Sequence, residues 1–132
     1  MKVLQPAGWA APKGYANGVA AEGLQVYVAG QIGWNAQCVF ESDDLVDQVR
    51  QTLLNVRAVL AEAGAGPEHI TRMTWYLVDK GEYLKRAREI GAVFRELIGV
   101  YSIAMTAVQV VALIEDRAQV EIEVTAVVPA AG

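Results

Sequence analysis

Two carboxylates stand one residue apart near the end of the chain, at Glu121 and Glu123 within the segment 120–127. The alternate positions of this segment are apolar, which is the pattern of a strand that buries one face. The carboxylates then share the opposite face, which is either bathed in water or lines a pocket or an interface. A carboxylate beside a bound water can deliver that water and handle a proton, so a carboxylate of this face is a candidate catalytic residue. The structural alternative is an ion pair with Arg72 or a solvated face.

The composition is that of one globular domain spanning residues 1–132. Hydrophobic residues make up 54% of the chain and charged residues 20%, so a core can form without disulfides or metals. The net charge of −4 and the lack of a basic run argue against a nucleic-acid partner. One cysteine and one histidine exclude an internal disulfide and leave no zinc-type ligand cluster, so we expect no metal site. No apolar run approaches the length of a membrane span and no leader is visible, so we expect no membrane partner and a cytoplasmic location.

Hydrophobic periodicity predicts strands and helices along the whole chain. The clearest element is a helix after the capping run 42–44, with an apolar stripe that ends at Gly64. A second helix is expected over 82–98. The strands are expected over 15–21 and 24–31, joined as a hairpin at 22–23, and over 70–78, 106–113 and 119–128. Two helices must then cover one face of one sheet, which gives a two-layer α+β sandwich.

The face of the predicted sheet that the helices leave uncovered is mixed in character. It is too polar for a second core, yet it includes large aromatic side chains among its members, Tyr27, Gln31, Arg72, Thr74, Tyr76, Gln109, Glu121 and Glu123. Sheet faces of this kind commonly associate with copies of themselves. We therefore expect a homo-oligomer whose sheets face inward.

Several short motifs keep the order and spacing found in one known family. They are Tyr15 followed by Gly18-Val19, the turn 29–32, Gln48, Asn55-Val56, Ala63-Gly64 and the tail 120–123. On these motifs the chain resembles the RidA (YjgF) family from residue 14 to residue 128. The resemblance implies a chorismate-mutase-like fold with a mixed sheet, a homotrimer around a barrel, and a small-molecule cleft at each subunit interface. Family members of the best-studied kind hydrolyse reactive enamines and imines to ammonia and a keto acid without a cofactor, so the resemblance implies none here.

The resemblance also assigns roles to residues of the cleft. It implies that Tyr15 and Gly30-Gln31 contact the substrate and that Glu121 positions or activates the attacking water. The resemblance gives Glu123 no role, so we favour the ion pair or the solvated face for Glu123. The serine that precedes the glycine in the family is Ala29 in this chain. The family's carboxylate-binding arginine falls on Met105, which cannot form the bidentate ion pair that a guanidinium forms. This departure points away from the imines of ordinary amino acids.

Two responses to the loss of that arginine are open. In the first response, another arginine supplies the cation, namely Arg88, Arg72 or Arg95. Arg88 lies where the family often has an asparagine. The alternative for Arg88 is a solvated helix charge, which we favour. The other response is a change of ligand, since apolar residues would line a cleft suited to an aromatic or uncharged compound, namely Ala29, Trp34, Met105 and Ala107. We favour the change of ligand, although Trp34 has an interface anchor as its alternative role.

Two function classes therefore compete. One is a hydrolytic deaminase of imine- or enamine-type metabolites with an altered substrate range, which Glu121 and Tyr15 favour. The other is a non-catalytic trimer that binds a small, relatively apolar metabolite, which Met105 favours. Some relatives carry a ribonuclease label, but the acidic charge and the missing basic patch make an endoribonuclease role weak here.

Overall fold

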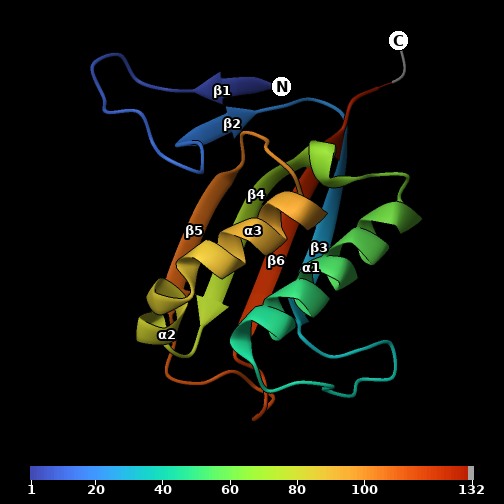
Figure 1. The fold of residues 1–132 in the computed structure, drawn as a ribbon. Helices are drawn as coiled ribbons and strands as arrows, with labels where there is room; N and C mark the ends of the chain where they lie inside the picture. The colour runs from blue at the N-terminus through green and yellow to red at the C-terminus, as the bar shows by residue number, and fades with distance from the viewer. Residues whose placement is uncertain (131–132) are drawn as a thin grey trace.

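A layer of helices packs against one face of a four-stranded sheet in the computed structural model, which describes residues 1–130 (Figure 1). The sheet has the strand order β3 (Leu24–Ile32), β6 (Val120–Val128), β4 (Ile70–Leu77) and β5 (Ala104–Gln109). The helices are α1 (Leu45–Glu62), α2 (Lys80–Lys85) and α3 (Ala87–Leu97), and a 3-10 turn at Pro67–His69 precedes β4. Two short strands, β1 (Lys2–Leu4) and β2 (Gly18–Ala20), pair with each other beside one end of the sheet.

The sheet is mixed in strand direction. Strand β6 runs antiparallel to both β3 and β4, whereas β4 and β5 are parallel. Strands β3 and β5 are the two edges. The predicted two-layer α+β sandwich with a mixed sheet is therefore confirmed.

The alternation of apolar residues explains why one face of this sheet is buried. The side chains of Met73, Trp75 and Leu77 on β4 and of Ile122 and Val124 on β6 join one core cluster. The apolar stripe of α1 packs into the same cluster through fully buried side chains, Val49, Leu53, Val56 and Leu60. Burying a side chain of this size contributes roughly 1.5–3 kcal/mol, so the stripe fixes α1 on the sheet.

Helix α1 begins and ends where the sequence predicts. Asp44 is the N-cap, and its side chain accepts a hydrogen bond from the backbone N–H of Asp47 (3.1 Å). After the helix, Gly64 has a φ of 68°, which glycine adopts without a steric penalty. The guanidinium of Arg86 also donates to Asp44 (2.9 Å), so the start of α1 is tied to the α2–α3 junction.

The second predicted helix, over 82–98, is two helices. Arg86 ends α2 and begins α3, with backbone angles (φ −99°, ψ 13°) outside the helical region. Its guanidinium donates to Asp44, Glu82 and Glu89 at 2.9, 3.4 and 2.9 Å, and these ion pairs hold the bend. The bend lets α3 direct its buried side chains at the core beside α1, namely Ile90, Val93 and Leu97.

The predicted N-terminal hairpin is wrong. Strand β2 is shorter than the predicted 15–21 and pairs with β1, while the partner of β3 is β6. Gly23 explains the change of partner, because its φ of 146° turns the chain closely against the backbone of Val128, where a Cβ would overlap the carbonyl. Strand β5 also starts earlier than the predicted 106–113, since Ala104 already pairs with β4.

Candidate functional site

Tyr15 and Met105 are far apart in the sequence but line the same pocket, which has a volume of about 510 Å³. The backbone N–H of Ala16 donates to the carbonyl of Ile103 (2.8 Å), which holds the segment before β2 against the start of β5. On β5, Met105 lies opposite Met73 of β4, on the helix-covered side of the sheet. The structure therefore brings these two predicted site residues together.

We call this cavity the aromatic pocket, because five aromatic side chains line it, those of Tyr15, Trp75, Tyr83, Phe94 and Tyr101. The sequence pattern assigns Trp75, Tyr83 and Phe94 to the core and gives no signal for Tyr101. The ring of Trp75 lies with its centroid 6.3 Å from that of Tyr83 and 6.2 Å from that of Phe94. Burial raises the pKa of Tyr83, so its hydroxyl stays neutral at pH 7. The walls are thus aromatic and uncharged along most of their surface.

Glu121 and Gly30 form a second group, on β6 and β3. A Cβ added at Gly30 would overlap Oε2 of Glu121 and lie 2.8 Å from its Cδ, so the carboxylate lies directly over the glycine backbone. The pairing register shifts between Val28 and Gln31, which marks a bulge in β3 at this point. The side-chain amide of Gln31 donates to the carbonyl of Ala29 (3.0 Å) within the same turn. The described residues that line the aromatic pocket include none of this group, so the two groups are separate within one chain.

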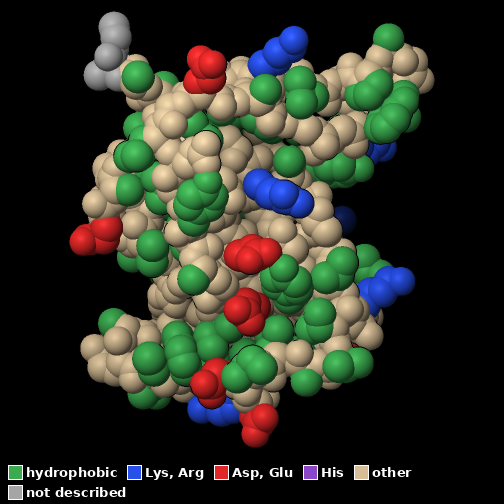
Figure 2. All heavy atoms as spheres, turned by 180° about the vertical axis from the view of Figure 1, so that it is seen from behind, with side chains coloured by type: hydrophobic (Ala, Val, Ile, Leu, Met, Phe, Trp, Pro, Cys, Tyr) green, Lys and Arg blue, Asp and Glu red, His purple; other side chains and the backbone are tan. Residues whose placement is uncertain are grey.

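The uncovered face of the sheet carries a polar cluster around Tyr76. The hydroxyl of Tyr76 donates to Oε1 of Glu123 (2.7 Å), and this hydrogen bond to a carboxylate raises the pKa of the tyrosine. Among residues 1–130, Glu123 forms no ion pair with Arg72, although both line one hollow of about 650 Å³ together with Tyr27 and Thr74. Figure 2 shows this face, with acidic side chains near its centre, a basic side chain above them and hydrophobic side chains around them.

Trp34 and Ala107 lie outside both groups. The ring of Trp34 has its centroid 5.8 Å from that of Phe40, and the two residues line a separate hollow of about 410 Å³ with Cys38. Ala107 is exposed on the edge strand β5. Neither residue lines the aromatic pocket within one chain.

Of the three arginines that could replace the missing cation, Arg95 is the one that lines the aromatic pocket. Arg88 is exposed at the other end of α3, and the neighbouring carboxylate of Glu89 binds Arg86 instead (2.9 Å). Arg72 lies on the uncovered face of the sheet. The structure thus separates the three candidates, and the one at the pocket is not Arg88, which the family resemblance had singled out.

Asn55 of α1 fixes the chain segment that follows Gly30. Its side-chain amide donates to the carbonyls of Ile32 (2.9 Å) and Trp34 (2.8 Å). The side chain of Gln51 donates to Oδ1 of Asn55 (2.9 Å), which fixes the orientation of the amide. The turn after β3 is therefore attached to a helix, and the Asn55-Val56 motif has a positioning role.

Gln48 attaches three further backbone groups, from two segments, to α1. Its buried amide donates to the carbonyls of Ser42 (3.1 Å) and Arg117 (2.9 Å), and its Oε1 accepts from the N–H of Gln119 (2.9 Å). Gly33 packs closely against it, because a Cβ there would lie 2.7 Å from the Cβ of Gln48. These contacts place the start of β6, and hence Glu121, relative to the helix layer.

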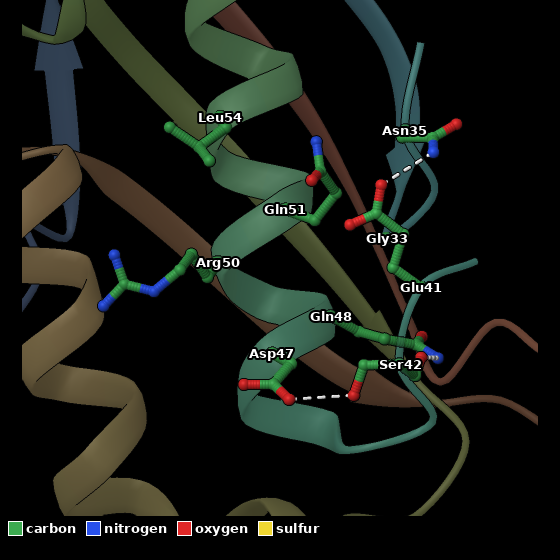
Figure 3. Close-up of a pocket in the computed structure, with 9 residues that line it drawn as sticks. All are labelled: Gly33, Asn35, Glu41, Ser42, Asp47, Gln48, Arg50, Gln51 and Leu54. Carbon is green, nitrogen blue, oxygen red and sulfur yellow. Dashed lines mark hydrogen bonds between the residues drawn. The ribbon is translucent and has the colours of Figure 1, made fainter. Parts of the chain in front are cut away.

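A small polar hollow of about 320 Å³ lies between α1 and the segment 33–42 (Figure 3). Figure 3 shows that its polar side chains are directed at one another in two hydrogen-bonded pairs, Asn35–Glu41 and Ser42–Asp47, each at 2.8 Å. Arg50 extends away from the hollow and pairs with Glu96 (2.6 Å). Because these groups have partners within the chain, the hollow serves to hold the segment against α1.

No three His, Cys, Asp or Glu side chains of residues 1–130 are grouped so that they could hold a metal ion. No helix in this part of the chain is long and apolar enough to cross a membrane.

Comparisons with known proteins agree with one another over nearly the whole chain. The family model described as Endoribonuclease L-PSP matches residues 7–128. A RutC family protein of Synechocystis sp. is 34% identical over 132 residues, which covers 98% of each chain. A RutC family protein of Aquifex aeolicus is 32% identical over 114 residues, covering 86% of this chain and 87% of the relative.

Solved structures of Rid proteins have the same fold. A Rid family protein of unknown function from Yersinia pestis superposes with a TM-score of 0.84 at 28% identity, covering 96% of this chain and 98% of that one. RidA from an Antarctic Psychrobacter superposes with a TM-score of 0.69 at 25% identity, covering 97% and 100% of the two chains. The chain therefore belongs to the RidA (YjgF) family, as its motifs predicted.

Proposed function

We propose that this chain forms a homotrimer with small-molecule clefts between its subunits and hydrolyses reactive imine- or enamine-type metabolites of an altered range. The observation that carries the proposal is the carboxylate of Glu121 held over Gly30. A carboxylate fixed in this way can hold and deprotonate a water molecule for attack on a C=N bond.

The need for a second subunit follows from the positions of the two groups. Gly30 lies on β3 and Met105 on β5, which are opposite edges of the sheet, whereas the family resemblance assigns both to one cleft. A second copy can bring its Glu121 group to the aromatic pocket of the first. The exposed ring of Tyr27 on the uncovered sheet face (69% exposed) supports self-association through that face.

The hydrolysis consumes one water and releases one ammonia for each imine. Glu121 accepts a proton from water as the water oxygen bonds to the imine carbon, and the proton passes to nitrogen to give a carbinolamine. Transfer of the hydroxyl proton to nitrogen then breaks the C–N bond and leaves a C=O bond. An enamine enters the same route after it gains a proton on carbon and becomes an imine.

The competing function is a non-catalytic trimer that binds a small, relatively apolar metabolite. The observation that favours it is Met105, which lines the aromatic pocket and packs partly against the core where the resemblance places an arginine. The thioether of Met105 gives an apolar, polarizable surface without charge, so this position cannot form the ion pair with a substrate carboxylate that an arginine forms.

The test measures ammonia release from imines generated in situ from aliphatic and aromatic amino-acid precursors. Glu121→Gln should lose roughly 10²- to 10⁴-fold in rate, as expected for the loss of a general base. Glu123→Gln is the matched control, because Glu123 lies on the same face of β6 and a glutamine there still accepts from Tyr76. Retained turnover in Glu121→Gln would remove this residue from the mechanism. A silent wild type with activity gained in Met105→Arg would favour the binding function instead.

A further inference from the structure

We infer that the aromatic pocket binds a planar aromatic compound that bears a carboxylate, and that Arg95 holds this carboxylate. The inference names the ligand class of the cleft and so rests on the function proposed above. It depends on three features of the pocket, namely its floor, its free space and its charge.

The floor of the pocket is a cluster of aromatic rings around Trp75. The indole of Trp75 is 2% exposed and has the rings of Tyr83 and Phe94 beside it, with centroids 6.3 and 6.2 Å away. Aromatic rings grouped in this way favour an aromatic ligand, which can pack on them in offset or edge-to-face contacts.

The free space in the pocket comes from a glycine in the middle of α3. A Cβ added at Gly91 would meet a single atom within 4 Å, Nη1 of Arg95 at 3.3 Å. Glycine is unfavourable in a helix, so this position weakens α3 and at the same time leaves room beside the rings. The volume of about 510 Å³ lies within the usual range for small-molecule sites, roughly 300–1,000 Å³.

The charge of the pocket is a single cation. The described residues that line it include Arg95 and no acidic side chain. Within residues 1–130 Arg95 has no ion pair, whereas Arg50, Arg86 and Arg117 each bind at least one carboxylate. The guanidinium folds back to lie beside Gly91, one turn earlier in the helix, so its donors remain beside the cavity. A planar guanidinium with free donors is the side chain best suited to bind a carboxylate bidentately.

Met105 completes the argument for an aromatic body. It occupies the position of the family's arginine, so the wall beside Tyr15 is apolar and the cation is on α3 instead. A short aliphatic acid would reach Arg95 but leave most of the aromatic wall in contact with water. An aromatic acid of the size of phenylpyruvate fills the apolar space while its carboxylate reaches the arginine.

The test is isothermal titration calorimetry of the full-length protein with three probes, namely phenylpyruvate, 2-oxobutyrate and the uncharged phenylacetone. Phenylpyruvate should bind at least about tenfold more tightly than 2-oxobutyrate, because the ring adds buried apolar surface. Arg95→Met should weaken phenylpyruvate roughly 10- to 100-fold, which corresponds to the loss of charged hydrogen bonds, and leave phenylacetone unchanged. Arg88→Met is the matched control and should change neither affinity. Gly91→Leu, which fills the pocket, should weaken phenylpyruvate and phenylacetone alike.

Two results would overturn the inference. One is equal affinity for phenylpyruvate and 2-oxobutyrate, and the other is the same loss in Arg95→Met and Arg88→Met. Titration and ammonia release, both measured on the wild type, separate the inference from the proposed hydrolysis. Selective binding of phenylpyruvate without ammonia release by the wild type supports the inference and removes the hydrolysis. Ammonia release from aliphatic imines without selective binding of phenylpyruvate removes the inference alone.

Discussion

The carboxylate of Glu121 lies over the backbone of Gly30, in the space that the Cβ of any other residue would need. The overlapping atom is the end of a flexible side chain, so a larger residue at this position would displace the carboxylate. A Cβ added at Gly33, three residues later, would lie 2.8 and 2.7 Å from the Cα and Cβ of Gln48, and these atoms cannot move without shifting α1. The two glycines are thus required for different reasons.

Gly30→Ala should therefore lower turnover while leaving the fold intact. Displacement of the carboxylate by about 1 Å is expected to reduce ammonia release on the order of 10²-fold. Its free energy of unfolding, measured by urea denaturation, should change by less than about 0.5 kcal/mol, because position 30 is exposed. Gly33→Ala is the control and should show the reverse, with a loss of roughly 1–3 kcal/mol from overpacking. Equal effects of the two substitutions on turnover would contradict this assignment.

Gln48→Leu should destabilise the protein strongly. The substitution leaves the carbonyls of Ser42 and Arg117 and the N–H of Gln119 without their partner. An unpaired buried group costs about 1–3 kcal/mol, and these three groups are only part-buried, so we use the lower end and expect a total loss of roughly 3 kcal/mol in urea denaturation. Gln37→Leu, at an exposed position, is the control and should be nearly neutral.

Gly91→Ala should stabilise the protein, in contrast to most substitutions near a binding site. Gly91 lies within α3, and an added methyl group meets only the mobile end of Arg95 at 3.3 Å. The gain expected from helix propensity is about 0.5–1 kcal/mol in urea denaturation. Ala92→Gly, at the exposed neighbouring position, should lose a similar amount. A destabilised Gly91→Ala variant would mean that the pocket does not have the free space described.

The ion pair between Asp44 and Arg86 should make stability depend on pH in the acid range. The hydrogen bond from the Arg86 guanidinium holds the pKa of Asp44 below its ordinary value. A lowered pKa in the folded state contributes stability above roughly pH 4, and this contribution disappears as the pH falls through the lowered pKa. Asp44→Asn, which can still cap α1, should cost roughly 0.5 kcal/mol at pH 7, because water screens much of the pair.

The measurement for Asp44 is urea denaturation of both proteins between pH 7 and pH 2, a range set by the ordinary pKa of a carboxyl group near 4. The stability difference between wild type and Asp44→Asn should shrink toward zero at the acid end. Asp43→Asn serves as the control, since Asp43 pairs with Arg117 at an exposed site, with 73% of its side chain accessible. A difference that stays constant with pH would show that the cap and not the charge is responsible.

Tyr27→Glu should convert the proposed trimer into monomers. The substitution places a charge on the uncovered sheet face, where burial on assembly costs on the order of several kcal/mol. Leu84→Glu is the control, because Leu84 is also exposed (58%) but lies on α2 in the helix layer. Sedimentation equilibrium at micromolar concentration distinguishes the two, and a monomeric wild type would remove the trimer altogether.

Sequence patterns predicted the elements whose hydrophobic period decides their structure, namely α1, β3, β4 and β6. They missed the break at Arg86 because the apolar stripe runs through it with an unchanged period. The structure shows the break in the backbone angles of Arg86, and three carboxylates around its guanidinium stabilise the bend. They joined β2 to β3 because a turn at Gly23 is a local signal, whereas the choice of partner strand is not local. Pairing between distant segments sets that choice.

The candidate site was predictable only in part. Motifs selected Tyr15 and Glu121, and the family resemblance grouped Tyr15 with Met105. The contact that holds these two residues together, from the N–H of Ala16 to the carbonyl of Ile103, has no signal in the sequence. Arg88 and Arg95 are seven residues apart on one helix, so they share a side of it and differ mainly by about 10 Å along its axis. Periodicity cannot distinguish two such positions, whereas the structure places only Arg95 at the pocket.

The Asn55 amide, which bridges the carbonyls of Ile32 and Trp34, has a consequence for how this protein can diverge. It ties the turn after Gly30 to α1, whereas Tyr83, Arg95 and Met105 belong to α2, α3 and β5, respectively. The proposed catalytic group and the proposed ligand site are thus held in place by different parts of the chain. Substitutions in 83–105 should therefore change the ligand that binds without displacing the carboxylate of Glu121.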